Sequence, residues 1–160
     1  MAWDRAALRK VSLTEARNLS PLFEEAVRNQ HPVLIVRNRR EWGLLLSRDA
    51  MLRMLASHRL RVNVLPEEDG SFTLWLRELS VGAHGLTLRE ARQQLLVAVR
   101  SYISDYLEQF DLYRQLPDRV SQEPYILRLS LARDDAELIE MLFPLASATE
   151  DEPEVRTTAG

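Results

Sequence analysis

The sequence contains no cysteine, which excludes disulfide bonds and thiolate metal sites. None of its apolar runs approaches the ~20 residues that a membrane-spanning helix needs. Scattered charges interrupt the N-terminus where a secretory signal would carry its apolar core. With 46% hydrophobic and 28% charged residues, the composition is that of a soluble globular protein. The 160 residues suffice for one domain of ordinary size or two very small ones, and we expect a cytoplasmic protein.

Residue clusters that support catalysis are also lacking from the sequence. The three histidines, His31, His58 and His84, are too scattered for an H-x-x-x-H metal pattern, and the five glycines form no phosphate-binding loop. The pair Asp134-Asp135 stands where a helix is expected to begin, and capping is the commoner role of aspartate there. Because catalysis needs a nucleophile, base or metal set in one place, we expect no enzyme, no cofactor and no metal.

Charge is distributed unevenly along the chain, whose net charge is −3. Residues 1–60 carry 11 basic and 6 acidic side chains, whereas residues 61–160 carry 10 basic and 18 acidic ones. Four of those acids stand together near the C-terminus: Glu150, Asp151, Glu152 and Glu154. The second half stays acidic without them. A basic first half and an acidic second half indicate two partners of opposite charge.

The first half begins with a strand and a helix. A short extended entry over 10–13 leads to Ser12 and Glu15, whose spacing is that of a capping box. Apolar residues at helical intervals follow as far as Val27. Pro21 within this stretch favours either a kink or a fresh start of the helix.

A hairpin and a second helix are expected next. The apolar runs 33–36 and 42–46 are joined by the polar link 37–41, and this arrangement predicts two antiparallel strands. Ser47 is expected to cap a helix that runs to about His58. The first half therefore has the predicted order strand, helix, strand, strand, helix.

The second half is expected to form another α+β domain. Its predicted elements are strands at 61–65 and 72–76, a third short strand within 79–85, a long helix from Thr87 to about Phe110, a strand at 125–131 and a helix at 134–143. The polar residues from 145 onward are expected to be disordered. The predicted fold class is α+β, with a first domain at 1–59, a β-β-(β)-α-β-α domain at 60–144, and an acidic tail at 145–160.

Residues Lys10–Leu55 resemble the N-terminal domain of the Phd/YefM antitoxins of type II toxin–antitoxin systems. The family pattern S-x-x-E-A-R-x-N-L-S is matched by S-L-T-E-A-R-N-L-S at 12–20, with one residue fewer before N-L-S. The family strand I-x-I-T-R is matched by L-I-V-R at 34–37. Arg40 stands where the hairpin loop usually carries glycine, and Asn38 can supply the left-handed backbone instead.

This resemblance implies a two-fold dimer that binds operator DNA. Arg17 would reach a base edge or a phosphate, and Arg37 matches a family residue that contacts the operator. Arg39 and Arg40 extend the same loop and can neutralise phosphates, and Lys10 in the entry strand adds to the same face. The alternative is a protein-interaction and dimerisation module that keeps this fold but has lost DNA binding.

In the second half, D-G-S-F at 69–72 and G-L-T-L-R-E-A at 85–91 resemble the hairpin and helix start of HicB-type antitoxins. Thr87 and Glu90 have the spacing of a capping box. A small dimerisation or toxin-binding domain of no named ancestry is the alternative. On either interpretation, this half is expected to be the toxin- or partner-binding domain of the chain.

Four aromatic residues lie at helical spacing along the long helix: Tyr102, Tyr106, Phe110 and Tyr113. The first three are expected to pack in the core, whereas Tyr113 and the strand residue Trp75 are expected to anchor a partner. The acidic surface of this half would complement a small basic ribonuclease-type toxin. We therefore predict an antitoxin that binds its operator as a dimer, represses its own operon and neutralises a cognate toxin by protein–protein contact.

Overall fold

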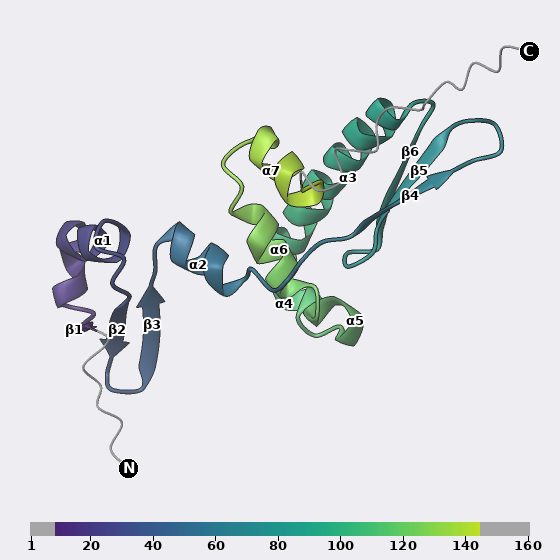
Figure 1. The fold of residues 1–160 in the computed structure, drawn as a ribbon. Coiled ribbons are helices and arrows are strands. Elements are labelled where there is room, and N and C mark those ends of the chain that lie inside the picture. Colours follow the sequence, from purple (N-terminus) through teal and green to yellow (C-terminus); the bar gives the residue numbers. More distant parts are fainter. Residues whose placement is uncertain (1–8, 145–160) are drawn as a thin grey trace, which may run out of the picture. The chain divides into compact units, whose positions relative to one another are not determined.

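The chain forms two compact units, Met1–Ser57 and His58–Gly160, and each is described by itself (Figure 1). The computed structural model describes residues 9–144, with side chains from Val11 onward. The acidic tail expected at 145–160 lies outside these residues. Among the helices within 9–144, none is long and apolar enough to span a membrane. The predicted α+β class is confirmed, since strands and helices alternate and then separate along the chain.

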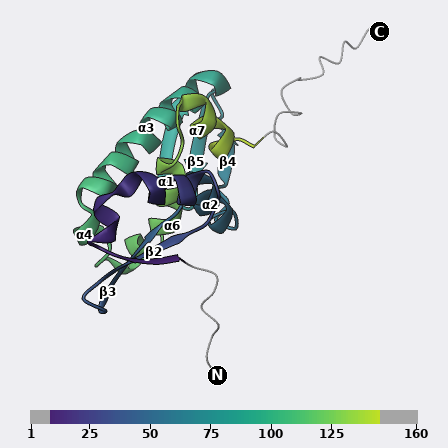
Figure 2. The same ribbon diagram turned by 90° about the vertical axis from the view of Figure 1, so that its left-hand side faces the viewer.

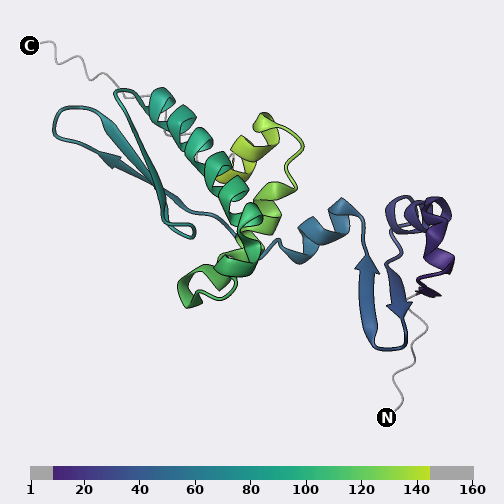
Figure 3. The same ribbon diagram turned by 180° about the vertical axis from the view of Figure 1, so that it is seen from behind.

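The first unit is built on a three-stranded mixed sheet. β1 (Arg9–Ser12) pairs in parallel with β2 (Val33–Arg37), and β2 pairs antiparallel with β3 (Glu41–Leu45). β-Branched and aliphatic residues fill most of β2, which suits its central position between two partner strands. The hairpin predicted from the two apolar runs is confirmed (Figure 3).

The first helical segment is divided in two. Ser12 and Glu15 form the predicted capping box: the Glu15 carboxylate accepts the Ser12 backbone N–H at 2.8 Å, and the Glu15 N–H donates to Ser12 Oγ at 3.2 Å. This box opens only a 3₁₀ turn, η1 (Glu15–Arg17), and α1 (Leu19–Val27) starts separately. Pro21 lies in the first turn of α1, where its missing N–H costs no hydrogen bond. The fresh helix start is therefore the correct alternative.

α1 covers one face of the sheet. Leu22 and Ala26 stand one turn apart on this helix and pack against Val11 and Val33. These four residues are almost completely removed from water and form the core of the first unit. The core is small because a helix of nine residues presents only two turns to the sheet.

α2 (Arg48–Met54) follows β3 after a short connection. As predicted, Ser47 is its N-cap, and the hydroxyl of Ser47 accepts the Ala50 N–H at 3.1 Å. The helix is shorter than the predicted run to His58, because the backbone leaves the helical region at Leu55.

The second unit begins with an antiparallel sheet whose three strands keep their sequence order. They are β4 (Val62–Pro66), β5 (Phe72–Leu76) and β6 (Val81–Gly85). All three predicted strands are confirmed. α3 (Leu88–Glu108) lies along one face of this sheet, and the alternation of β5 turns Leu74 and Leu76 toward it (Figures 1 and 3).

The connection from β6 to α3 depends on Gly85. A Cβ atom at this position would lie 2.3 Å from the backbone nitrogen of Ala91, so another residue requires the helix to move. Thr87 caps α3 by accepting the Glu90 N–H at 3.1 Å, and the Glu90 carboxylate accepts the Leu86 N–H at 2.9 Å. The G-L-T-L-R-E-A segment therefore fixes where the helix docks on the sheet.

The strand predicted at 125–131 is wrong, because this segment is the helix α6 (Glu123–Ser130). Pro124 stands in its first turn, where proline favours a helix start. Ile126 and Leu129 are both buried in one core. Residues three apart share a helix face but point to opposite faces of a strand, so only a helix buries both. The second unit thus has three strands and a long helix followed by shorter helices, in place of β-β-(β)-α-β-α.

Short helices complete the second unit. α4 (Phe110–Tyr113) and α5 (Pro117–Val120) lead from α3 to α6. α7 (Asp135–Leu142) packs beside α3 (Figure 2). Its N-cap is Asp134, whose Oδ1 accepts the Glu137 N–H at 2.9 Å, so the predicted helix over 134–143 and its aspartate cap are confirmed.

Aromatic residues of α3 and α4 lie in this core or pack against it. Tyr106 is fully buried, and Tyr102 and Phe110 pack against the buried cluster, so the core role predicted for all three is confirmed. The Tyr106 hydroxyl donates to the Arg119 carbonyl at 2.9 Å, and the Tyr102 hydroxyl donates to Gln122 at 2.5 Å. Because burial penalises the phenolate, the pKa of Tyr102 and the pKa of Tyr106 lie above their ordinary value.

Candidate DNA interface and partner surfaces

The turn between β2 and β3 carries three of the predicted DNA-binding residues. The Arg40 N–H donates to the Arg37 carbonyl at 3.1 Å, and the two residues between them have positive φ, 49° at Asn38 and 59° at Arg39. This is the geometry of a type I′ turn, in which asparagine and glycine are the usual residues. The left-handed conformation predicted for Asn38 is confirmed. Arg39 adopts it as well, at a cost of about 1 kcal/mol, because its Cβ crowds the backbone.

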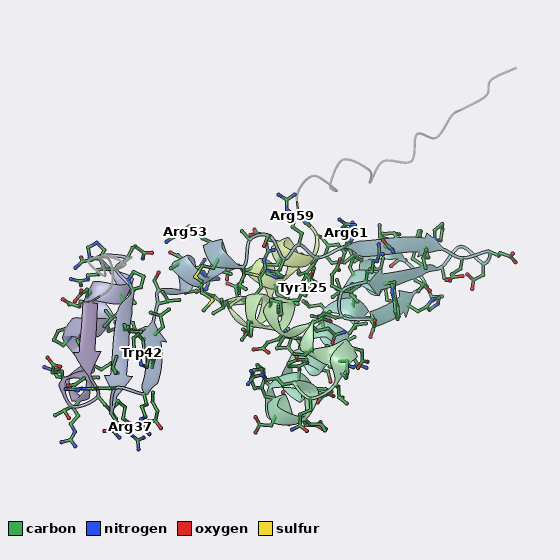
Figure 4. All side chains as sticks on the ribbon, turned by 90° about the horizontal axis from the view of Figure 1, so that it is seen from below. Arg37, Trp42, Arg53, Arg59, Arg61 and Tyr125 are labelled. Atoms are coloured by element: carbon green, nitrogen blue, oxygen red, sulfur yellow. The ribbon has the colours of Figure 1, made fainter. Side chains whose placement is uncertain are left out.

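All three arginine side chains of this turn are exposed. Arg37 Nε lies 3.2 Å from Glu41 Oε2 across the hairpin, and 59% of the arginine side chain is open to solvent (Figure 4). An ion pair this exposed contributes roughly 0–1 kcal/mol, so Arg37 can exchange the carboxylate for a phosphate. Within residues 9–144, no ion pair engages Arg39 or Arg40.

The chain leads to Arg17 from the same end of the sheet as this turn. β1 and β2 run parallel with Ser12 aligned with Val36, so the chain leaves β1 at the turn end of β2. η1 follows directly and ends in the exposed Arg17. Lys10 is aligned with Leu34 instead, two residues farther from that end. The sheet therefore groups the three turn arginines at one end, from which the chain enters η1 and Arg17, and it places Lys10 farther from the turn.

The sheet face opposite α1 is apolar and partly open: Val36 of β2 is only 8% exposed on it, whereas the β3 residues beside it are far more exposed. Leu34 is aligned with Leu44 and Val36 with Trp42, and aligned residues share a face of the sheet. Leu44 is 50% exposed and Trp42 is 53% exposed. Large apolar side chains gathered on one open face are typical of a protein–protein contact.

Trp75 lies on the face of the second sheet that points away from α3. It alternates with the buried residues Leu74 and Leu76 along β5, and it is 40% exposed. Its indole lies over Gly82 of β6, where a Cβ atom would come within 2.7 Å of the ring carbon Cε3. Leu65 of β4 is 49% exposed and shares this outer face.

Tyr113 does not share that outer face. Its ring stacks on the ring of Tyr106, with centroids 4.9 Å apart and an angle of 17° between the planes. This contact lies on the α3 side of the unit, so the structure does not bring Tyr113 and Trp75 together. That either residue anchors a partner stays a prediction.

Sequence reasoning missed a basic region of the second unit. A pocket of about 470 Å³ opens between β4, α3 and α7, and a smaller one of about 190 Å³ adjoins it. The two pockets share Leu60 and Pro144, and four arginines line them: Arg61 and Arg92 the larger, Arg59 and Arg128 the smaller. Figure 4 shows Arg59 and Arg61 projecting from the same side of this unit. Arg59 and Arg61 stand on either side of Leu60 in the sequence. Because alternate residues of an extended chain point the same way, this spacing could have indicated that the two arginines share one side.

Residues 7–144 match the PHD-like family, described as the antitoxin of RelE/RelB toxin–antitoxin systems. The fold is similar to a crystal structure of an antitoxin part of a proposed toxin/antitoxin system from Syntrophomonas wolfei subsp. wolfei, with a TM-score of 0.72 and 25% sequence identity over 83% of this chain and 95% of that one. No curated protein matches the sequence. Because the family match spans most of the chain, the protein belongs to the PHD-like family of toxin–antitoxin antitoxins.

Proposed function

We propose that this antitoxin binds operator DNA as a homodimer through its first unit, represses its own operon in the cytoplasm and neutralises a cognate toxin through its second unit. The observation that carries the proposal is the β2–β3 turn, which projects Arg37, Arg39 and Arg40 into solvent from one end of a small sheet. Membership of an antitoxin family supports a toxin as the protein partner and a regulatory role without catalysis.

The open apolar face of the first sheet supports the homodimer. Trp42 and Leu44 each leave about half of their surface in water, although they are among the largest apolar residues of the unit. A two-fold axis through this face would bring the same residues of a second copy against them. Burying a large apolar side chain contributes roughly 1.5–3 kcal/mol, so a few such residues suffice to hold two copies together.

The turn arginines support DNA binding. A two-fold dimer presents Arg17 and the turn once to each of two half-sites, which doubles the number of positive charges. The planar guanidinium matches phosphate oxygens in pairs, and each neutralised phosphate releases condensed counterions. The left-handed backbone at Arg39 supports the same assignment, because a strained arginine at a turn position that favours glycine suggests a functional demand.

The outer face of the second sheet supports contact with the toxin. Trp75 and Leu65 expose apolar surface on the same side of neighbouring strands. Tryptophan is among the residues that most often carry the binding energy of an interface. The acidic excess of residues 61–160 suits a basic partner such as a small ribonuclease.

The DNA-binding part is tested with the double variant Arg39→Gln/Arg40→Gln. Binding to the promoter duplex upstream of the gene is measured by fluorescence anisotropy at a series of salt concentrations. The variant removes two charges from each protomer, so the slope of log K against log salt is expected to fall by ~3.6, at roughly 0.9 for each lost phosphate contact.

The matched control is Arg28→Gln. Arg28 is an exposed arginine of the same unit, paired with Glu24 at 3.7 Å after the end of α1, and its loss is expected to leave the slope unchanged. If the double variant binds the duplex as tightly as the wild type and with the same slope, the turn does not contact DNA. The interaction module that keeps this fold without binding DNA is then the better description.

A further inference from the structure

The two basic pockets of the second unit adjoin the point where the described chain ends. Pro144 is the last described residue, and it lines both pockets. We propose that these pockets receive the acidic C-terminal segment of the same chain, residues 145–154. This contact is separate from the proposed DNA and toxin surfaces, and it involves only residues of the second unit.

The larger pocket combines apolar and basic surface. Val64, Phe72 and Phe143 are among its apolar lining residues, and Val64 is 46% exposed although it is on the sheet face that meets α3. The guanidinium carbon of Arg92 lies 5.2 Å from the centroid of the Phe143 ring, which holds this arginine at the pocket wall. Arg61 is exposed on the β4 side of the pocket. A ligand that fits this lining carries small apolar groups followed by carboxylates.

The backbone that carries Arg59 is anchored beside the smaller pocket. Arg128 Nη1 donates to the carbonyl of His58 at 2.6 Å, and the His58 ring packs edge-on against Tyr125 with centroids 5.3 Å apart. These contacts fix the start of the unit on α6, and Arg59 follows immediately with its side chain exposed. Arg59 and Arg61 are therefore presented from an anchored backbone, which limits the entropy lost when they bind an anion.

Positive charge prevails around the two pockets. Glu140 is the carboxylate that lines the smaller one, and the Glu78 carboxylate accepts the Arg61 backbone N–H at 2.8 Å. These two acids face four arginines in a half of the chain that is otherwise acidic. A local excess of arginine inside an acidic domain favours an acidic ligand.

The sequence after Pro144 has the required chemistry. It reads L-A-S-A-T-E-D-E-P-E, in which small and apolar residues precede four carboxylates. Ten residues reach at most about 35 Å when fully extended, which is enough to follow both pockets from Pro144. Because the segment is tethered beside its site, its effective concentration is on the order of millimolar, so even weak contacts keep it bound. In that position it neutralises Arg59 and Arg61 and leaves phosphate binding to the first unit.

The proposal is tested by paramagnetic relaxation in the full chain. The protein has no cysteine, so Ala148→Cys introduces a single thiol for a nitroxide label. The amide signals of the pocket-lining residues Val62, Phe72 and Arg92 are expected to lose most of their intensity, relative to the same sample with the nitroxide reduced. Added salt is expected to restore part of that intensity, because the exposed charges become screened.

The same label is then placed in the Arg59→Gln/Arg61→Gln variant. Both side chains are exposed, so the fold is expected to persist and the pocket signals to recover their intensity. The matched control is Arg89→Gln, since Arg89 is an exposed arginine of α3 that lines neither pocket. This control is expected to keep the full signal loss.

Two outcomes would overturn the proposal. Pocket signals that keep their intensity, or lose it equally in the double variant, would show that the arginines do not hold the segment. Equal signal loss in a mixture of isotope-labelled chains and separate nitroxide-labelled chains would show that the segment of a second copy occupies the pockets. Neither outcome affects the promoter-binding experiment, which depends on the first unit alone.

Discussion

The two units differ in how completely each buries its own apolar surface. In the first unit, the buried core consists of four residues beneath α1, while Trp42 and Leu44 stay half exposed on the other face of the sheet. In the second, twelve buried residues form one core that several helices share with the sheet. A sheet covered on one side by a nine-residue helix leaves its other side to water. In the proposed homodimer a second copy covers this open face of the first unit, whereas most of the large apolar residues of the second unit pack within the one chain.

The largest effect is expected in the second unit, where the backbone of β6 closely approaches α3 at Gly85. Gly85→Ala places a methyl group 2.3 Å from the backbone nitrogen of Ala91, so α3 must shift away from β6. Overpacking of this kind costs about 3 kcal/mol. The unfolding free energy of the second unit, measured by native-state hydrogen exchange of the α3 amides, is expected to fall by that amount. The β2 amides of the first unit are expected to keep their protection.

The matched control for this variant is Gly82→Ala, near the start of the same strand. There the added methyl group meets the ring of Trp75 at 2.7 Å, a side chain on the open face that can rotate away. Its cost is expected to stay below about 1 kcal/mol. A loss as large as that of Gly85→Ala would show that any methyl group added to this strand destabilises the unit. The close approach of the Ala91 backbone would then not be the reason that Gly85 is necessary.

A smaller effect of a different kind is expected on the partly open sheet face of the first unit. Trp42→Ser/Leu44→Ser removes apolar surface that the monomer already exposes, so it costs the isolated fold little. If the face is the dimer contact, the double variant loses about 2 kcal/mol of association energy and its dimer dissociation constant rises about 30-fold. Analytical ultracentrifugation across a dilution series measures this constant.

The control for the dimer contact is Leu19→Ser. Leu19 is a 51% exposed leucine at the start of α1, on the opposite side of the sheet. Its substitution is expected to leave the dissociation constant unchanged. A monomeric wild-type protein at all concentrations would remove the need for a second copy and with it the main difference between the two units.

Local signals in the sequence predicted much of this fold. The caps Ser47, Thr87 and Asp134 each accept the backbone N–H three residues later, because capping depends on a few neighbouring atoms. The strands of both sheets were also predictable from alternation and apolar runs. The segment around Ile126 was not, since its short apolar pattern suits a strand or a helix and its packing against α3 decides between them.

The residues of a candidate site could be predicted where they are close in the sequence, but not where only folding brings them together. Arg37, Arg39 and Arg40 are consecutive or nearly so, and a resemblance to a known family placed them on one turn. The basic pockets join Leu60 to Pro144, residues more than eighty positions apart, so only the folded chain shows that they meet. That the chain enters η1 and Arg17 from the turn end of the sheet is visible only from the parallel pairing of β1 with β2.

The smallest effect is expected at the turn itself, where the first unit carries backbone strain. Arg39→Gly removes a Cβ atom from a residue with φ of 59°, while the more flexible unfolded chain offsets part of the gain. The net expectation is a stabilisation of about 0.5 kcal/mol, seen as slower hydrogen exchange of the β2 amides. Arg40→Gly is the control, because Arg40 is not in the left-handed region, and it is expected to destabilise the turn slightly. If Arg39→Gly also destabilises the unit, contacts of the arginine outweigh its strain, and the turn is then kept for the stability of the first unit and not for a partner.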